Sequence, residues 1–99
     1  MRSPTLTGAQ RKWLRGQAHP LDPVVRLGKQ GLTERVLREI DQALESHELI
    51  KVQAGSKEEN RELAAAAEAL GAAVVGAVGH VTILFRSQPD REKRKLVLP

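Results

Sequence analysis

The strongest constraint on the fold is residues 24–54, where a short apolar run, a helical pattern and a second apolar run follow one another. The run "VVRL" at 24–27 predicts a short buried strand. Residues 32–47 repeat apolar side chains at the spacing of one helix face, and "ELIKVQA" at 48–54 alternates like a strand. Two strands joined by a helix favour a right-handed parallel crossover, so this segment predicts a sheet covered by helices.

A further helix is predicted at the N-terminal side, over residues 7–17, because Thr7 and Gln10 have the spacing of a capping box. Leu6, Gln10, Trp13 and Gln17 would lie on its narrow inner side. The connector "AHPLDP" at 18–23 carries two prolines, which end the helix and favour an extended chain.

The C-terminal half predicts a third helix and a hairpin. Ser56 and Glu59 have capping-box spacing, and Gly71 suits the C′ position of a helix that ends near Leu70. The runs at 72–78 and 80–86 flank Gly79-His80, where glycine in the first turn position suits a type II′ turn. The last two strands should therefore be antiparallel neighbours.

The expected order is α-β-α-β-α-β-β, an α/β (α+β) fold with a small mixed four-stranded sheet packed with helices. Ninety-nine residues suffice for one domain, predicted over residues 1–86. Residues 87–99 have no periodic pattern and are interpreted as a basic C-terminal tail.

Composition narrows the class of partner. Sixteen Lys and Arg against twelve Asp and Glu give a net charge of +4, which is compatible with a polyanion. Trp13 and Phe85 are the only aromatic residues, so phosphate contacts rather than base stacking would have to supply affinity for nucleic acid. The chain has no cysteine, no signal sequence and no apolar run of membrane-spanning length, and we expect it to be cytoplasmic.

No enzymatic motif is evident. His19, His47 and His80 are dispersed, and "HELIK" at 47–51 lacks the second histidine of a zinc-protease helix. Paired acids such as Glu58 and Glu59 suit the first turn of a helix. We therefore expect no catalytic residue, no cofactor and no metal ion.

The loop Gly28-Lys29-Gln30-Gly31 is the main candidate site. Its G-x-x-G spacing matches the loop by which KH domains clamp a nucleic-acid backbone. It would lie at the start of the predicted helix, where backbone N–H groups and the helix dipole favour anions. Turns between strands and helices also use glycine for a positive φ, so spacing alone leaves both interpretations open.

Further cations could extend such a site. Arg35 and Arg38 follow the loop on the predicted helix, and Arg11, Lys12 and Arg15 would form the outer face of the first helix. These charges have a plain structural interpretation too. Glu34–Arg38 and Arg35–Glu39 are i, i+4 pairs typical of a solvated helix face, and the basic tail also contains acids.

Four separated motifs resemble one known family: "AHPL" at 18–21, "LGKQG" at 27–31, "HELIKV" at 47–52 and "GHVTILFR" at 79–86. In this order they resemble the CRM domain (chloroplast RNA splicing and ribosome maturation), and specifically its bacterial single-domain YhbY members. The last motif departs from the family pattern, because Phe85 precedes Arg86 where tyrosine is usual.

The resemblance implies a fold similar to the C-terminal domain of translation initiation factor three. It also implies a non-enzymatic RNA-binding protein that associates with large-subunit ribosomal RNA or its precursor particle, with the GxxG loop as RNA contact. We expect a monomer with no membrane and no small-molecule substrate. The alternative is a protein-interaction module that docks through Val81, Ile83 and Phe85 or through the tail, with the loop only a turn. DNA binding would share the same electrostatics.

Overall fold

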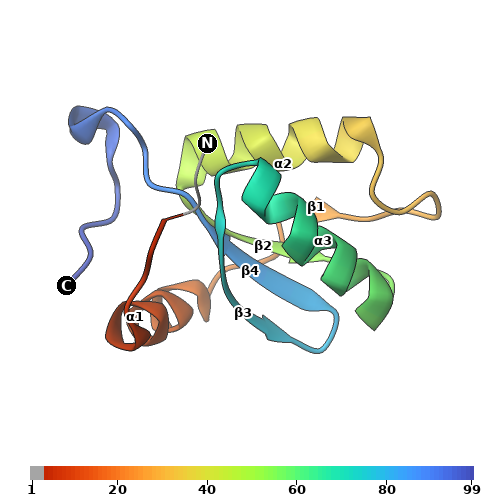
Figure 1. Cartoon of the computed structure of the whole chain (residues 1–99), viewed down its shortest axis with the longest axis horizontal. Helices are drawn as coiled ribbons and strands as arrows, with labels where there is room; N and C mark the ends of the chain where they lie inside the picture. Colours follow the sequence, from red (N-terminus) through yellow and green to blue (C-terminus); the bar gives the residue numbers. More distant parts are fainter. Residues whose placement is uncertain (1–3) are drawn as a thin grey trace.

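The computed structural model describes residues 4–99 of the chain. Within them lie three α-helices, four strands and a final 3₁₀ turn: α1 (Gly8–Ala18), β1 (Val25–Arg26), α2 (Glu34–His47), β2 (Leu49–Gln53), α3 (Lys57–Ala69), β3 (Ala73–Val78), β4 (Val81–Phe85) and η1 (Arg91–Lys93). This order confirms the predicted α-β-α-β-α-β-β fold (Figure 1). None of the helices in the described range is long and apolar enough to cross a bilayer.

The strands form one mixed sheet in the order β1-β2-β4-β3. β1 and β2 are parallel, as the crossover through α2 requires, and β4 is antiparallel to both of its neighbours. The closing hairpin therefore inserts β4 between β2 and β3. Because β4 is central, almost all of its residues are buried.

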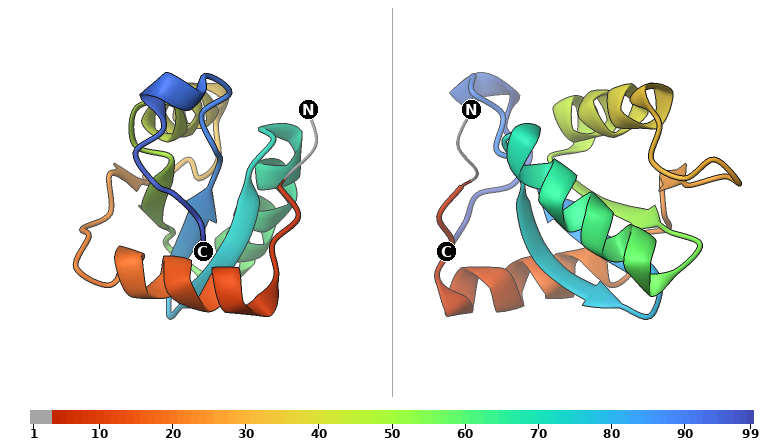
Figure 2. Two further views of the ribbon diagram at one scale, coloured as in Figure 1. Left: turned by 90° about the vertical axis from the view of Figure 1, so that its left-hand side faces the viewer. Right: turned by 45° about the vertical axis from the view of Figure 1, so that its right-hand side comes forward.

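The helices cover both faces of the sheet (Figure 2). On one face α2 and α3 pack on a core of buried residues: Val25, Ile40, Leu44, Ile50, Val52, Leu63, Ala67, Ala72 and Leu84. On the other face α1 packs on a second core, which comprises Leu14, Ala18, Leu49, Val75, Ile83 and Phe85. Neighbouring residues of β2 and β4 supply opposite cores, as the period of two in a strand requires.

Several local signals are confirmed. Thr7 and Gln10 form the complete capping box of α1. Gly71 has φ +71, and its N–H donates to Glu68 O while Ala72 N donates to Ala67 O, the pattern of a Schellman motif. Gly79 has φ +60 at the first position of the β3–β4 turn, as a type II′ hairpin needs.

Two element boundaries and one cap differ from the prediction. α2 begins at Glu34 rather than at residue 32, because Thr33 is the N-cap and its hydroxyl accepts from Val36 N at 3.2 Å. β1 shortens to two residues, and Val24 is 50% exposed rather than buried. At α3 the Glu59 carboxylate accepts from Gly55 N at 2.9 Å, one residue before the Ser56 cap, so the capping box is only half formed.

The inner face of α1 is also rotated from the predicted one. Leu14 and Ala18 are buried, whereas Gln17 is exposed. This rotation brings Arg11 and Arg15 against β3, where Arg11 Nη1 donates to Val74 O at 2.7 Å and Arg15 Nη1 donates to Val75 O at 3.3 Å. A register irregularity between Val74 and Gly76 marks this part of β3.

Residues 87–99, interpreted above as a tail, lie against the domain. Leu96 and Leu98 pack on the core beneath α1. The buried Glu48 carboxylate accepts hydrogen bonds from the backbone N–H groups of Gln88, Lys95 and Leu96. Glu48 ends α2 with φ +61, a left-handed conformation that is uncommon for a residue with a side chain.

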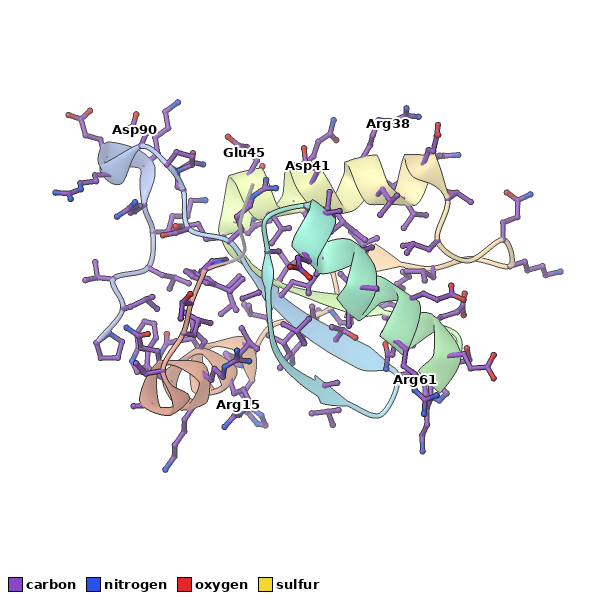
Figure 3. The ribbon with its side chains drawn as sticks, in the orientation of Figure 1. Arg15, Arg38, Asp41, Glu45, Arg61 and Asp90 are labelled. Atoms are coloured by element: carbon purple, nitrogen blue, oxygen red, sulfur yellow. The ribbon has the colours of Figure 1, made fainter. Side chains whose placement is uncertain are left out.

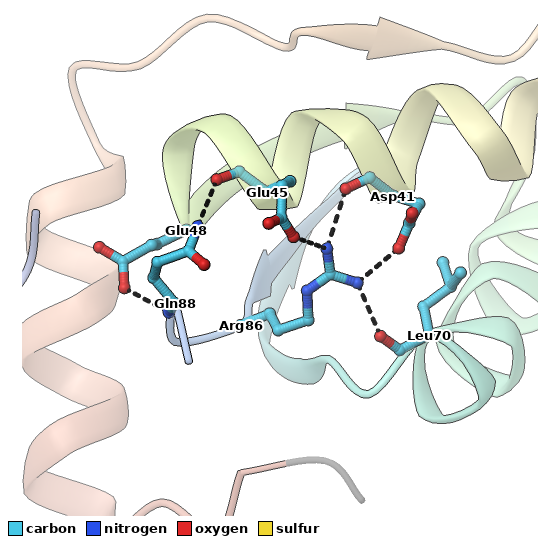
Figure 4. Close-up of polar contacts among 6 residues, drawn as sticks. All are labelled: Asp41, Glu45, Glu48, Leu70, Arg86 and Gln88. Carbon is cyan, nitrogen blue, oxygen red and sulfur yellow. Dashed lines mark hydrogen bonds and ion pairs between the residues drawn. The ribbon is translucent and has the colours of Figure 1, made fainter. Parts of the chain in front are cut away.

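Arg86 fixes the chain just before this segment (Figure 4). Its guanidinium donates to Asp41 Oδ1 at 2.6 Å, Asp41 O at 2.9 Å, Glu45 Oε2 at 3.3 Å and Leu70 O at 2.9 Å. One buried arginine thus joins the end of β4 to α2 and to the end of α3. Charge-assisted bonds of this kind satisfy the buried guanidinium.

Candidate nucleic-acid interface

The GKQG loop is a tight four-residue turn that projects from the body between β1 and α2 (Figure 1). Gly31 N donates to Gly28 O at 3.0 Å and closes the turn. Lys29 and Gln30 occupy its two corner positions and are exposed. Gly31 has φ +69, a conformation that glycine adopts without strain.

The base of this loop rests on the start of α3. A Cβ atom built on Gly31 would lie 2.8 Å from Glu59 Oε2, and one built on Gly55 would lie 2.7 Å from Glu59 Oε1. The Glu59 carboxylate therefore sits between the two loops, and its end would have to move if either glycine carried a side chain.

A shallow depression of about 430 Å³ lies between the loop and the first turns of α2. Its wall comprises the four loop residues with Arg26, Thr33, Arg35, Val36 and Glu39. Arg26, Lys29 and Arg35 bring three positive charges, against one negative charge from Glu39. Arg35 Nε lies 3.5 Å from Glu39 Oε1, and the Arg35 side chain is 84% exposed, so this ion pair leaves it accessible.

The depression can hold an anion. Although Leu32 and Thr33 separate the loop from α2, the first N–H groups of a helix have no acceptor within the helix, and both Thr33 and Arg35 line the depression. The absence of side-chain bulk at Gly28 and Gly31 allows a phosphate to approach the backbone. The arrangement offers an anion electrostatic attraction from Arg26, Lys29 and Arg35.

Sequence reasoning missed Arg26. The signal that could have found it is strand alternation, since Val25 is buried under α2 and α3 and Arg26 must then face the other way. Because β1 ends at Arg26, this side chain lies at the entry of the loop.

The other predicted cations are not gathered at the loop. Arg38 is exposed on α2 but does not line the depression. Arg11, Lys12 and Arg15 belong to α1, on the opposite face of the sheet from α2 (Figure 3 shows Arg15 and Arg38 on opposite sides of the molecule). Lys12 is exposed, whereas Arg11 and Arg15 bind carbonyl groups of β3.

Residues 4–99 contain no group of side chains suited to a metal ion, because no three His, Asp or Glu side chains come together there. Every buried side-chain nitrogen or oxygen of the described residues has a hydrogen-bond partner. The features of the depression beside the GKQG loop that could bind a ligand are therefore its charged side chains and its backbone.

Comparison with known proteins finds several relatives that are named RNA-binding or probable RNA-binding proteins. The chain is 46% identical over 98 residues to an RNA-binding protein of Haemophilus influenzae, covering 96% of both chains. It is 32% identical to the "Probable RNA-binding protein YqeI" of Bacillus subtilis, covering 95% of this chain and 99% of the relative. A protein of Methanocaldococcus jannaschii, also named a probable RNA-binding protein, is 42% identical over 89% of this chain and 69% of its own length.

The fold has a solved counterpart. The solution structure of a hypothetical protein of Staphylococcus aureus, described as a candidate RNA-binding protein, superimposes with a TM-score of 0.79 at 34% identity. It covers 96% of this chain and all of that one. The sequence profile of the CRS1/YhbY (CRM) domain matches residues 6–86, which is most of the chain. The chain therefore belongs to the CRS1/YhbY (CRM) domain family.

Proposed function

We propose that this protein is a non-enzymatic RNA-binding protein that holds the RNA backbone in the depression beside the GKQG loop. The observation that carries the proposal is the convergence of Arg26, Lys29 and Arg35 on two glycines at that depression. The relatives are named RNA-binding or probable RNA-binding proteins, which supports RNA as the polyanion.

The binding mode follows from the groups available. Phosphate oxygens would accept hydrogen bonds from the loop backbone and from Arg26, Lys29 and Arg35. Glu39, which pairs with Arg35, would lower the net positive charge of the depression. Stacking of successive bases on aromatic side chains is not available, because Phe85 is buried and Trp13 packs against the core beneath α1. Recognition should therefore depend weakly on base sequence.

For the biological target, we propose large-subunit ribosomal RNA or its precursor particle, bound in the cytoplasm by a monomeric chain. This finer assignment follows the resemblance to YhbY-like proteins. The competing idea of protein docking through β4 has less support, because Phe85 is fully buried and Ile83 is 4% exposed, which leaves Val81 as the one partly exposed member of that set.

The test of the loop is Lys29→Ala. We expect weaker binding of single-stranded RNA and a salt slope of log K that falls in magnitude by about 0.7 from a starting value of about −3 to −4. Lys93→Ala is the matched control, since Lys93 is an equally exposed lysine in η1, outside the depression. Anisotropy titrations of labelled RNA at several salt concentrations measure both quantities. Unchanged affinity and slope in Lys29→Ala would refute the loop assignment.

Sedimentation on a density gradient tests whether the RNA target is ribosomal, and it uses the wild-type protein and Lys29→Ala. Tagged wild-type protein in a cell extract should sediment with large-subunit precursors on a density gradient, and Lys29→Ala should shift toward the top. Ribonuclease treatment should release the wild-type protein as well. Wild-type protein found only at the top of the gradient would contradict the assembly role while leaving RNA binding intact.

A further inference from the structure

The sheet face beneath α1 is only partly covered. α1 packs over Leu49, Val75 and Phe85. Beyond its C-terminal end, near the β3–β4 turn, a groove of about 580 Å³ remains open. Val78, Val81 and Ile83 contribute apolar side chains to it, and Val78 is 72% exposed. The connector that follows α1 forms the opposite wall with Pro20, Leu21 and Pro23.

Polar side chains surround this apolar groove. The cations Arg15 and Lys51 line it together with His19, against one acid, Asp22. Lys51 Nζ donates to His19 O at 3.2 Å, and Arg15 Nη1 donates to Val75 O at 3.3 Å. An ammonium group has three donors and a guanidinium five, so each of these side chains has donors left for a ligand. The groove therefore suits a ligand that combines anionic groups with flat apolar ones.

The groove is built on a fixed support. Asn60 of α3 is buried and its Nδ2 donates to Gly79 O at 2.9 Å, while Thr82 Oγ1 donates to Asn60 Oδ1 at 2.9 Å. Ala54 N donates to His80 O at 2.8 Å from the adjoining loop. The hairpin that carries Val78 and Val81 is thus tied to α3 and to the loop after β2.

A row of polar side chains joins the groove to the GKQG depression. Arg26 lines the depression and is in register with Gln53 of β2. Gln53 and Lys51 are two residues apart on one strand, so they share a face at a separation of about 7 Å. Gln53 is exposed, and Lys51 lines the groove. The face from Arg26 to Lys51 is therefore an open polar path from one hollow to the other.

We propose that this groove, lined by Arg15, His19, Lys51, Val78 and Val81, is a second contact for the same single-stranded RNA that the GKQG loop holds. The proposal rests on the proposed function. The RNA would continue from the loop over Arg26 and Gln53, with a phosphate at Lys51 and a base against the valines. The two cations of the rim, Arg15 and Lys51, favour RNA over an apolar peptide, which would gain nothing from them.

The test compares two RNA lengths and two variants. Lys51→Gln removes the charge and keeps most of the side-chain stem, and Val78→Thr keeps the branched shape while making it polar. For a labelled 12-nucleotide oligouridine at physiological salt, we expect Lys51→Gln to weaken binding about fourfold and Val78→Thr about threefold. A 4-nucleotide oligouridine should bind through the loop alone, so it should lose affinity with Lys29→Ala but not with these variants.

Matched controls come from the C-terminal segment. Lys93→Gln and Val97→Thr make the same chemical changes at exposed positions outside the groove, and Val97 is 84% exposed. Both should bind the 12-nucleotide RNA as the wild type does. Thermal unfolding of each variant verifies that it is folded, and the methyl NMR signals of Val78 and Val81, but not of Val97, should shift on addition of this RNA.

The outcomes separate the two proposals. If Lys29→Ala weakens binding while Lys51→Gln and Val78→Thr bind the 12-nucleotide RNA normally, with unshifted valine methyl signals, the groove proposal is overturned and the loop assignment stands. If the groove variants weaken binding and Lys29→Ala does not, the loop assignment fails instead. Wild-type protein that binds neither RNA would overturn both, and the groove would then be left to a protein partner.

Discussion

At the scale of single residues, the two glycines of the GKQG loop have different structural roles. Gly31 has φ +69, and a Cβ atom there would lie 2.8 Å from Glu59 Oε2. A Cβ atom on Gly28 would meet nothing within 4 Å. Only Gly31 is therefore required by the conformation of the loop, whereas Gly28 matters for what approaches it from outside.

This difference makes a paired prediction. Gly31→Ala should lower the free energy of unfolding by about 1–3 kcal/mol, because it forces a side chain into a strained left-handed conformation. Gly28→Ala should change it by less than about 0.5 kcal/mol. Urea denaturation followed by circular dichroism measures both. Equal losses for the two variants would show that the fold does not depend on the positive φ at Gly31.

The residues of the loop were predictable from sequence, but their surroundings were not. G-x-x-G spacing is local and identified Gly28 to Gly31 directly. Which cations accompany the loop depends on which way each side chain faces and on which elements meet in space. Arg26 joins the depression through its position at the end of β1, whereas Arg11 and Arg15 belong to α1, which packs on the opposite face of the sheet from α2.

At the scale of elements, the C-terminal segment is part of the fold through Glu48. The carboxylate of this residue is buried and accepts from three backbone N–H groups of residues 88–96. The segment lacks any periodic pattern, so sequence reasoning treated it as a tail. The contacts that hold it are made by a residue about 40 positions earlier, and no local pattern signals them.

A double-mutant cycle tests this anchor. In the full chain, Glu48→Gln should cost about 1–3 kcal/mol of unfolding free energy, because an amide cannot accept all three bonds and its NH₂ group would be buried. In a chain shortened to end at Ser87, the same substitution should cost less than about 0.5 kcal/mol. Urea unfolding gives the four values. Glu62→Gln on the exposed face of α3 is the control and should cost little in either chain.

If Glu48→Gln has the same cost with and without residues 88–99, the carboxylate does not hold the segment. That result would leave the segment attached by the packing of Leu96 and Leu98 and by the hydrogen bond from Gln88 Nε2 to Glu45 O.

The type and order of the elements were predicted better than their arrangement. Caps, prolines and apolar periodicity are local signals, because each depends on residues a few positions apart. They predicted α1, α3 and the hairpin closely. The place of β4 between β2 and β3 depends on pairing across more than 30 residues of chain, as in Leu49 with Phe85. Alternation of apolar residues gives the faces of a strand but not its neighbours.

At the scale of the whole molecule, the two cores share one sheet. β2 and β4 send alternate side chains to each face, as Leu49 and Ile50 do. Loss of either core removes support from the same central strands. We therefore expect a single cooperative unfolding transition.

Two probes can check this cooperativity. Trp13 packs against the core beneath α1, so its fluorescence reports on that face, whereas far-ultraviolet circular dichroism reports mainly on α2 and α3. The two urea curves should coincide. Ile40→Val, in the opposite core, should shift both curves equally by about 1 kcal/mol. A fluorescence transition at a lower urea concentration than the circular dichroism transition would show that α1 unfolds separately. A fluorescence transition that Ile40→Val does not shift would show the same.

The contact between α1 and β3 also bears on self-association. β3 is an edge strand, and the edge of a sheet can recruit a strand from a second molecule through its free backbone groups. Arg11 and Arg15 already occupy the carbonyl groups of Val74 and Val75, and they place two positive charges where an incoming chain would have to lie. We therefore expect Arg11 and Arg15, which suggested an RNA surface in the sequence, to oppose edge-to-edge association of this strand.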